Sequence, residues 1–133
     1  MDAEVLGPKH WSERFEHDVC SAKFSQDGLV IILSTKNENG IDANLEISFE
    51  WVTAFRFMDE SDMQYYSVLS CLSLNFHVFK ILSGGWSNGE TRQKGILDAS
   101  AGVYPEYLIA TNNGCIQVLS GVNPNIGWRP DGV

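Results

Sequence analysis

The chain has 133 residues, of which 44% are hydrophobic and 20% are charged, and its formal net charge is −8. This length predicts one domain, because most domains hold roughly 100 to 150 residues. No apolar run reaches the roughly 18 residues of a membrane helix, so we expect no insertion into a membrane. An acidic chain repels the phosphate backbone of nucleic acids, so we expect no binding to nucleic acid.

The acidic excess lies in the first half of the chain. Residues 1–62 hold 13 acids and 5 bases, whereas residues 63–133 hold 4 of each, and an acidic surface attracts cationic proteins. The N-terminus lacks a basic start followed by an apolar core, and the three cysteines are odd in number and widely spaced. We therefore expect a cytoplasmic protein with reduced thiols and no disulfide framework.

The first predicted elements are a helix and a hairpin. A short helix near 9–17 is predicted from two aromatic residues one turn apart. The runs VCSAKF and LVIILS flank Asp27-Gly28, a strong signal for a two-residue hairpin loop. This loop predicts the cross-strand pairs Phe24 with Ile31, Ala22 with Leu33, and Cys20 with Thr35. Cys20 is then expected to pack at the edge of a core, and its single His-x-x-Cys spacing to His17 predicts no metal site.

Two strands follow the turn at Asn39-Gly40. In ANLEISFE, apolar and polar positions alternate, which predicts a half-buried strand with Glu46 and Glu50 on a wet face. In WVTAFRFM, residues 51–58, nearly every position is apolar, which predicts a strand covered on both sides. Arg56 is the exception, and we expect it to reach solvent at the end of this strand.

The middle of the chain mixes weak helix signals with one strand. Ser61 and Gln64 have the spacing of a capping box and predict a helix start. LNFHVFKIL predicts a strand in which His77 is a satisfied structural histidine rather than a catalytic base. The glycine-rich segment 83–104 predicts a loop with a short helix that begins near Ser87.

The last hairpin is predicted from YPEYLIATNNGCIQVLSG, residues 104–121. An Asn113-Gly114 loop pairs Ile109 with Val118 and places Cys115 on the face opposite the apolar one. No basic neighbour in the hairpin lowers the pKa of this thiol, so it is expected to stay protonated. The turn-rich residues 122–133 are expected to form a loosely docked tail.

These elements predict a single domain, 1–133, of the β-rich α+β class. Antiparallel hairpins form one curved or doubled sheet, with one to three short helices at its ends or on one face. Two candidate sites follow from the residues. The first is an acidic patch for a cationic protein, formed by Glu46, Glu50, Asp59, Glu60 and Asp62. The alternative is an aromatic pocket for a small ligand, formed by Trp51, Tyr65, Tyr66, His77 and Trp86.

The chain carries no phosphate-binding loop or dinucleotide fingerprint, so we expect no cofactor. It also carries no serine nucleophile elbow, and we favour a protein that is not an enzyme. A Cys-His pair of Cys71 or Cys115 with His77 remains open as a catalytic alternative. The sequence does not decide whether Cys20, Cys71 or Cys115 is reactive.

Residues 45–60, LEISFEWVTAFRFMDE, and residues 107–124, YLIATNNGCIQVLSGVNP, carry a resemblance to small uncharacterised bacterial proteins, some of which are immunity proteins that neutralise toxins. The resemblance implies non-catalytic binding to a protein, and it assigns no site residues. We therefore expect an immunity-type inhibitor whose acidic face masks a basic partner. Two other interpretations stay open: a small-ligand binder or minor enzyme, and a homodimer joined through an edge strand.

Overall fold

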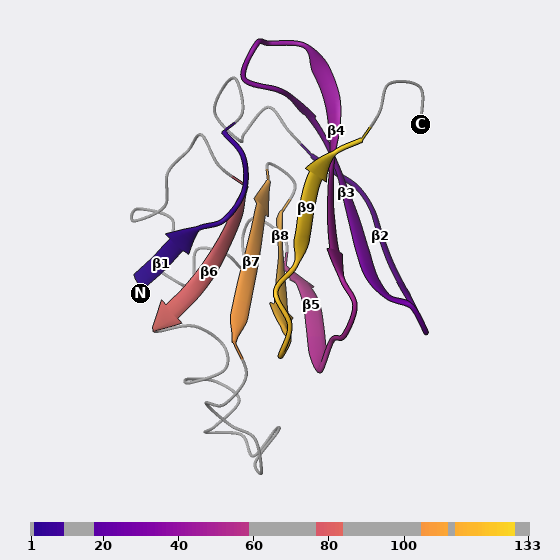
Figure 1. Cartoon of the computed structure of the whole chain (residues 1–133), viewed down its shortest axis with the longest axis vertical. Coiled ribbons are helices and arrows are strands. Elements are labelled where there is room, and N and C mark those ends of the chain that lie inside the picture. The colour runs from indigo at the N-terminus through magenta and orange to yellow at the C-terminus, as the bar shows by residue number, and fades with distance from the viewer. Residues whose placement is uncertain (1, 10–17, 59–76, 84–104, 112–113, 130–133) are drawn as a thin grey trace.

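Nine strands in two antiparallel sheets lie in the part of the chain that the computed structural model describes (Figure 1). The described residues are 2–9, 18–58, 77–83, 105–111 and 114–129. The five-stranded sheet has the order β1 (Asp2–Val5), β6 (Val78–Ser83), β7 (Glu106–Thr111), β8 (Gly114–Leu119) and β5 (Ala54–Met58). The four-stranded sheet has the order β2 (Asp18–Ser25), β3 (Gly28–Lys36), β4 (Asp42–Phe49) and β9 (Asn125–Trp128).

The prediction of a β-rich fold built from antiparallel strands is confirmed, and the sheet is double rather than single. The described residues contain no helix. Two of the three predicted helices fall outside the described ranges, and the one near 9–17 does so apart from Lys9. Within those ranges there is also no helix long and apolar enough to cross a membrane.

The main core lies between the two sheets, as in a β-sandwich. Its buried residues come from β3, β4, β6, β7 and β8. They are Leu29, Ile31, Leu33, Leu45, Ile47, Phe49, Val78, Tyr107, Ile109, Ile116 and Val118. The predicted alternation in β4 and the predicted apolar face of the β7–β8 hairpin supply seven of these residues and are confirmed.

Both predicted hairpins form, but each register differs from the prediction by two residues. Phe24 pairs with Leu29 rather than with Ile31, and Ile109 pairs with Ile116 rather than with Val118. The reason is that each glycine begins the second strand instead of closing the loop. Gly28 has a φ of 112° and Gly114 a φ of 147°. A shift by two residues keeps every side chain on its predicted face, because the side-chain period of a strand is two.

A β-bulge in β2 corrects the expectation for Cys20. The register between β2 and β3 shifts between Val19 and Ser21, so Cys20 is the extra residue. Cys20 is exposed rather than packed at the edge of the core. Val19, one residue earlier, packs against the main core instead.

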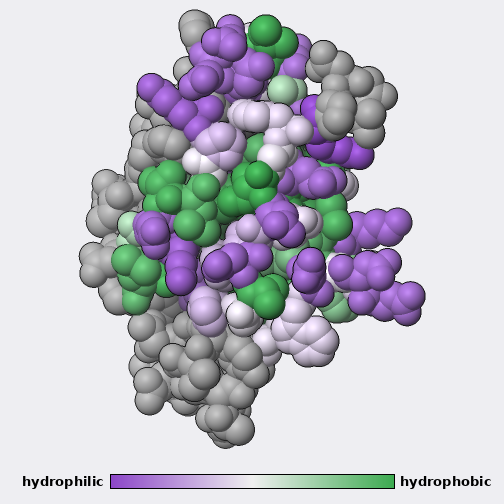
Figure 2. Space-filling view, in the orientation of Figure 1, coloured by the Kyte–Doolittle hydropathy of each residue, from purple (hydrophilic) through white to green (hydrophobic). Residues whose placement is uncertain are grey.

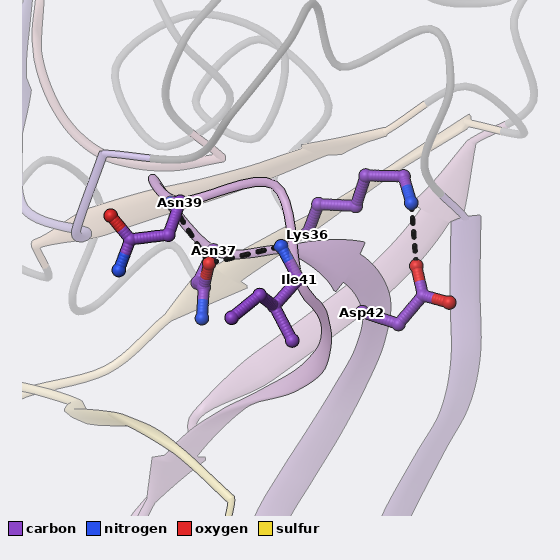
Figure 3. Close-up of polar contacts among 5 residues, drawn as sticks. All are labelled: Lys36, Asn37, Asn39, Ile41 and Asp42. Carbon is purple, nitrogen blue, oxygen red and sulfur yellow. Dashed lines mark hydrogen bonds and ion pairs between the residues drawn. The ribbon is translucent and has the colours of Figure 1, made fainter.

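The turn between β3 and β4 is held by the side chain of Asn37 (Figure 3). Its Oδ1 accepts hydrogen bonds from the backbone N–H groups of Asn39, at 2.9 Å, and Ile41, at 3.2 Å. Lys36 and Asp42 close the strand ends with an ion pair of 2.7 Å. The hydrogen bond and the charge of Lys36 lower the pKa of the exposed Asp42 carboxyl. Asparagine is common in such turns because its side chain can replace a backbone acceptor.

The prediction that residues 51–58 form a strand covered on both faces is wrong. The strands that are buried on both faces are β7 and β8. Every residue of β7 and β8 is buried. The outer face of these strands belongs to a second buried cluster, which consists of Met58, Phe79, Ile81, Leu108, Ala110 and Cys115. In β5, Phe55 and Phe57 are exposed because this strand forms an edge of its sheet.

Two short strands were not predicted. β1 pairs with β6, and β9 pairs with β4, where Ile126 lies opposite Ile47 and Trp128 opposite Leu45. Ile126 and Trp128 also pack against the main core. The part of the predicted tail that contains these residues is therefore an edge strand of the four-stranded sheet.

Candidate functional site

Two residues of the predicted acidic patch lie in the described part of the chain. Glu46 is on the outer face of β4, where its Oε1 lies 3.8 Å from Arg129 Nε. Glu50 follows the end of β4 and is exposed. The other three residues of the patch, Asp59, Glu60 and Asp62, fall outside the described residues. Glu46 and Glu50 are four residues apart, or about 13 Å along an extended strand.

The outer face of the four-stranded sheet carries a balance of charges. Its acids and bases occupy neighbouring register positions on β2, β3, β4 and the residue after β9. They are Asp18, Asp42 and Glu46, against Lys23, Lys36 and Arg129. An interspersed face of this kind has little net field, so it does not favour a basic partner strongly.

The structure does not bring together the two described residues of the predicted aromatic pocket. The carbonyl oxygen of Trp51 accepts a hydrogen bond from Ser120 Oγ, next to the last residue of β8. His77 bonds to Ala110, which pairs with Cys115 near the start of β8. These anchor points are about 17 Å apart along the strand. Tyr65, Tyr66 and Trp86 lie outside the described residues.

His77 joins the two sheets. The ring is 1% exposed, its Nδ1 lies 2.8 Å from the carbonyl oxygen of Ala110, and its Nε2 lies 3.3 Å from Thr35 Oγ1. A carbonyl oxygen only accepts, so Nδ1 donates and Nε2 accepts from the Thr35 hydroxyl. Because both ring nitrogens are engaged, this arrangement is that of a structural histidine.

A polar row crosses the outer face of the five-stranded sheet. Arg56 Nε donates to Gln117 Oε1 at 2.7 Å, and Gln117 Nε2 donates to Glu106 Oε2 at 3.4 Å. Gln117 and Glu106 are each 2% exposed. Arg56 is therefore half-buried and hydrogen-bonded to a neighbouring strand. The prediction that its side chain reaches solvent at the end of the strand is corrected. The row satisfies the polar atoms that lie on an otherwise apolar face.

Cys115 lies beside this row, and its surroundings favour the neutral thiol. Burial raises the pKa of its thiol to about 12, and the positive charge of Arg56 offsets only part of that rise. The thiol therefore keeps its proton at neutral pH, as predicted, and a protonated thiol is a poor nucleophile.

The raised pKa of Cys115 predicts that stability falls as pH rises above its ordinary value of 9.0. The unfolded thiol loses its proton there, whereas the folded thiol keeps it until about pH 12, so ionisation favours the unfolded state. The free energy of unfolding should fall by about 1 kcal/mol from this group between pH 9 and pH 10, and the slope approaches about 1.4 kcal/mol per pH unit once the unfolded thiol is fully ionised. Urea unfolding at pH 8, 9 and 10 measures the slope.

The matched control for this slope is Cys115→Ala. Burial also raises the pKa of Tyr107 above 10.0, so Tyr107 adds a smaller slope near pH 10 that is the same in both proteins. The difference between the two proteins isolates the thiol, and the Cys115→Ala variant should lose most of the slope between pH 9 and pH 10. Equal slopes in the two proteins would show that Cys115 ionises as easily in the folded state as in the unfolded one.

An aromatic ridge lies on the open side of the sandwich, where β2 and β5 are the edge strands of their sheets. Phe24, Phe55 and Phe57 form this ridge. They are 58%, 39% and 53% exposed, and the ring centroids of Phe24 and Phe55 are 5.6 Å apart. Their cross-strand partners Leu29, Val118 and Ile116 are buried in the main core. The ridge therefore continues the core outward to solvent.

Two acidic residues lie in the loops that adjoin the ridge, one after β2 and one after β4. Glu50 and the exposed Trp51 directly follow β4, and Asp27 lies in the turn between β2 and β3. The two loops are close, because a Cβ added at Gly28 would lie 2.0 Å from the carbonyl oxygen of Phe49. Asp27 and Glu50 are both exposed and, among the described residues, neither makes an ion pair.

The described part of the chain thus defines an antiparallel β-sandwich with one exposed aromatic side. Comparisons with protein-family models, with curated proteins and with solved structures found no significant match to this chain. Within the described ranges, no three His, Cys, Asp or Glu side chains gather as metal ligands.

Sequence reasoning missed the ridge as a site. Phe24 and Phe55 are about thirty positions apart and meet only because β2 and β5 are both edge strands. A sequence signal did exist in β5: Phe55 and Phe57 alternate with Ala54 and Arg56, as in a strand with two different faces.

Proposed function

We propose that this chain is a non-catalytic protein-binding domain whose contact surface is the aromatic ridge. The observation that carries the proposal is the exposure of three phenylalanine side chains on neighbouring edge strands. Monomeric proteins seldom leave contiguous aromatic surface in water, and aromatic residues are enriched at the centres of protein interfaces.

The partner that fits this surface is a protein with exposed arginine or lysine beside an apolar patch. Asp27 and Glu50 supply negative charge at the ridge, and the whole chain has a net charge of −8. Cationic side chains also stack favourably on exposed Phe and Trp rings. Negative charge speeds the approach of such a partner, and the ridge then supplies the buried contact area.

In its specific form, the proposal is an immunity-type inhibitor from bacteria that covers the basic substrate surface of a toxin. It rests on the resemblance of residues 45–60 and 107–124, and on the charge at the ridge. The mechanism is occlusion, which needs no catalytic group in this chain. The sequence assigned this part to Glu46, Glu50, Asp59, Glu60 and Asp62. In the proposal Glu50 keeps it and Asp27 takes the place of Glu46, because Arg129 accompanies Glu46.

The test is affinity capture from the source cell's lysate at low and high salt, with wild type and ridge variants side by side. We expect one basic protein to bind wild type and to be released by salt. Phe24→Ser and Phe57→Ser should each weaken binding about tenfold or more, as at interface hot spots. Leu82→Ser is the matched control, because Leu82 is 57% exposed on β6, away from the ridge.

The charge contribution is tested separately. Asp27→Asn and Glu50→Gln should lower the association rate and its dependence on salt. Glu38→Gln, in the turn at the opposite end of β3 and β4, should leave both unchanged. Retention of the partner by the Phe24 and Phe57 variants would refute the ridge as the contact surface. A doubled mass in solution that the same variants abolish would instead assign the ridge to a homodimer.

A further inference from the structure

A second open side of the sandwich holds a groove. It lies between β1 and β6 of one sheet and β9 of the other, and its volume is about 330 Å³. It is lined by Glu4, Leu6, Lys80, Asn123, Pro124 and Ile126. In Figure 1, β9 passes in front of β8, and β1 and β6 lie to its left. Figure 2 shows hydrophobic residues across the middle of this face, bordered by hydrophilic ones.

The groove presents one acid and one base side by side. Glu4 on β1 and Lys80 on β6 are direct cross-strand partners. Such partners have Cβ atoms about 5 Å apart. Even so, among the described residues neither forms an ion pair with the other. Both charged heads are therefore available to a ligand that carries the two opposite charges close together.

The remaining lining supplies one oriented amide and an apolar wall. Tyr107 donates its hydroxyl proton to Asn123 Oδ1 at 2.9 Å, which fixes that amide and leaves its N–H groups as donors. Leu6 and Ile126 pack against the main core and expose part of their surface at the groove. This wall can cover an apolar side chain but cannot satisfy a second polar group.

We propose that this groove binds a free amino acid with an apolar side chain. The ligand carboxylate lies at Lys80 and the amide of Asn123, the ammonium group lies at Glu4, and the side chain lies on Leu6 and Ile126. A volume of about 330 Å³ is at the lower end of ligand pockets, which suits one amino acid rather than a nucleotide. The site lies on other strands than the ridge and does not depend on the function proposed there.

The test uses L-leucine as the probe, with binding measured by calorimetry and by ligand-detected NMR. Wild type should bind leucine, and Lys80→Met and Glu4→Gln should each raise the Kd about tenfold or more, as expected for a lost charge-assisted contact. Lys36→Met and Glu38→Gln are the matched controls and should leave the Kd unchanged. Phe57→Ser should also bind leucine normally, so a failure of the ridge proposal is distinguishable from a failure here.

Two ligand analogues test the assignment of the charged groups. N-acetyl-leucine lacks the ammonium group and should bind wild type weakly, and glycine lacks the side chain and should also bind weakly. The proposal is overturned if wild type does not bind leucine. It is also overturned if N-acetyl-leucine binds as well as leucine and Glu4→Gln changes neither affinity, because the groove would then be a site for simple carboxylates. Thermal melting of each variant verifies that the fold is intact.

Discussion

Gly28→Ala is expected to destabilise the protein by about 3 kcal/mol or more, from strain and overpacking together. The backbone of Gly28 has a φ of 112°, which side-chain-bearing residues rarely adopt. A Cβ there would also lie 2.0 Å from the carbonyl oxygen of Phe49, a backbone atom that cannot turn aside. The midpoint of thermal unfolding should fall by about 10 °C or more in a domain of this size.

The chain offers two matched controls for this substitution. A Cβ added at Gly121 or at Gly127 meets nothing within 4 Å. Gly121→Ala and Gly127→Ala should therefore unfold within about 0.5 kcal/mol of wild type, as neutral surface substitutions do. The same melting experiment compares all three proteins.

A third variant separates close approach from turn chemistry. Asparagine tolerates positive φ in turns better than other residues with a side chain. If strain at positive φ were the whole effect, Gly28→Asn would recover part of the stability that Gly28→Ala loses. We expect Gly28→Asn to be as damaging as Gly28→Ala, because its Cβ meets the same carbonyl oxygen. A stable Gly28→Asn protein would contradict the close packing of the β2–β3 turn against β4.

The position of Gly28 also explains how far the sequence predicts the hairpins. Alternation of apolar residues specifies which side chains share a face, and those faces are confirmed in β3, β4, β7 and β8. The loop position is less well specified, because Asp-Gly and Asn-Gly mark a turn without saying whether glycine closes the loop or begins the next strand. In both hairpins glycine begins the strand, so each predicted register differs by two residues.

The assignment of edge and central strands could not be made from local sequence. Residues 51–58 are almost wholly apolar, yet β5 is an edge strand with two exposed phenylalanines. By contrast, β7 and β8 contain the polar residues Glu106 and Gln117 and are buried on both faces. The hydrogen bond between Gln117 and Glu106 makes the burial of these two polar side chains possible. Such a contact joins two strands, so the sequence of either strand alone does not predict it.

The two candidate sites depend on the same long-range information. The aromatic ridge combines β2 with β5, and the groove combines β1, β6 and β9, each from a distant part of the sequence. β1 and β9 are each four residues long and lie beside Gly, Pro or Asn, so neither carries a strong strand signal. The sequence did indicate the negative charge around the ridge, because the acidic excess of the first half of the chain can be read from composition alone.

Phe49→Ala is expected to destabilise the protein by about 3 to 5 kcal/mol, the usual loss for a buried phenylalanine. Phe49 is the last residue of β4 and is 1% exposed. Its ring packs against Tyr107 of the opposite sheet, with centroids 5.3 Å apart and an interplanar angle of 60°. The substitution removes this contact between the sheets and leaves a cavity. Chemical denaturation measures the loss.

Phe57→Ala is the matched control for Phe49→Ala, since the same ring is deleted at a position that is 53% exposed. Its cost should stay below about 1 kcal/mol, because surface substitutions seldom exceed that. Tyr107→Phe, which removes only the hydroxyl bonded to Asn123, should cost about 1 kcal/mol and keep the ring contact. If Phe57→Ala were as costly as Phe49→Ala, the side between β2 and β5 would be part of the closed core. The ridge would then serve folding, and its phenylalanines would not be free to bind a partner.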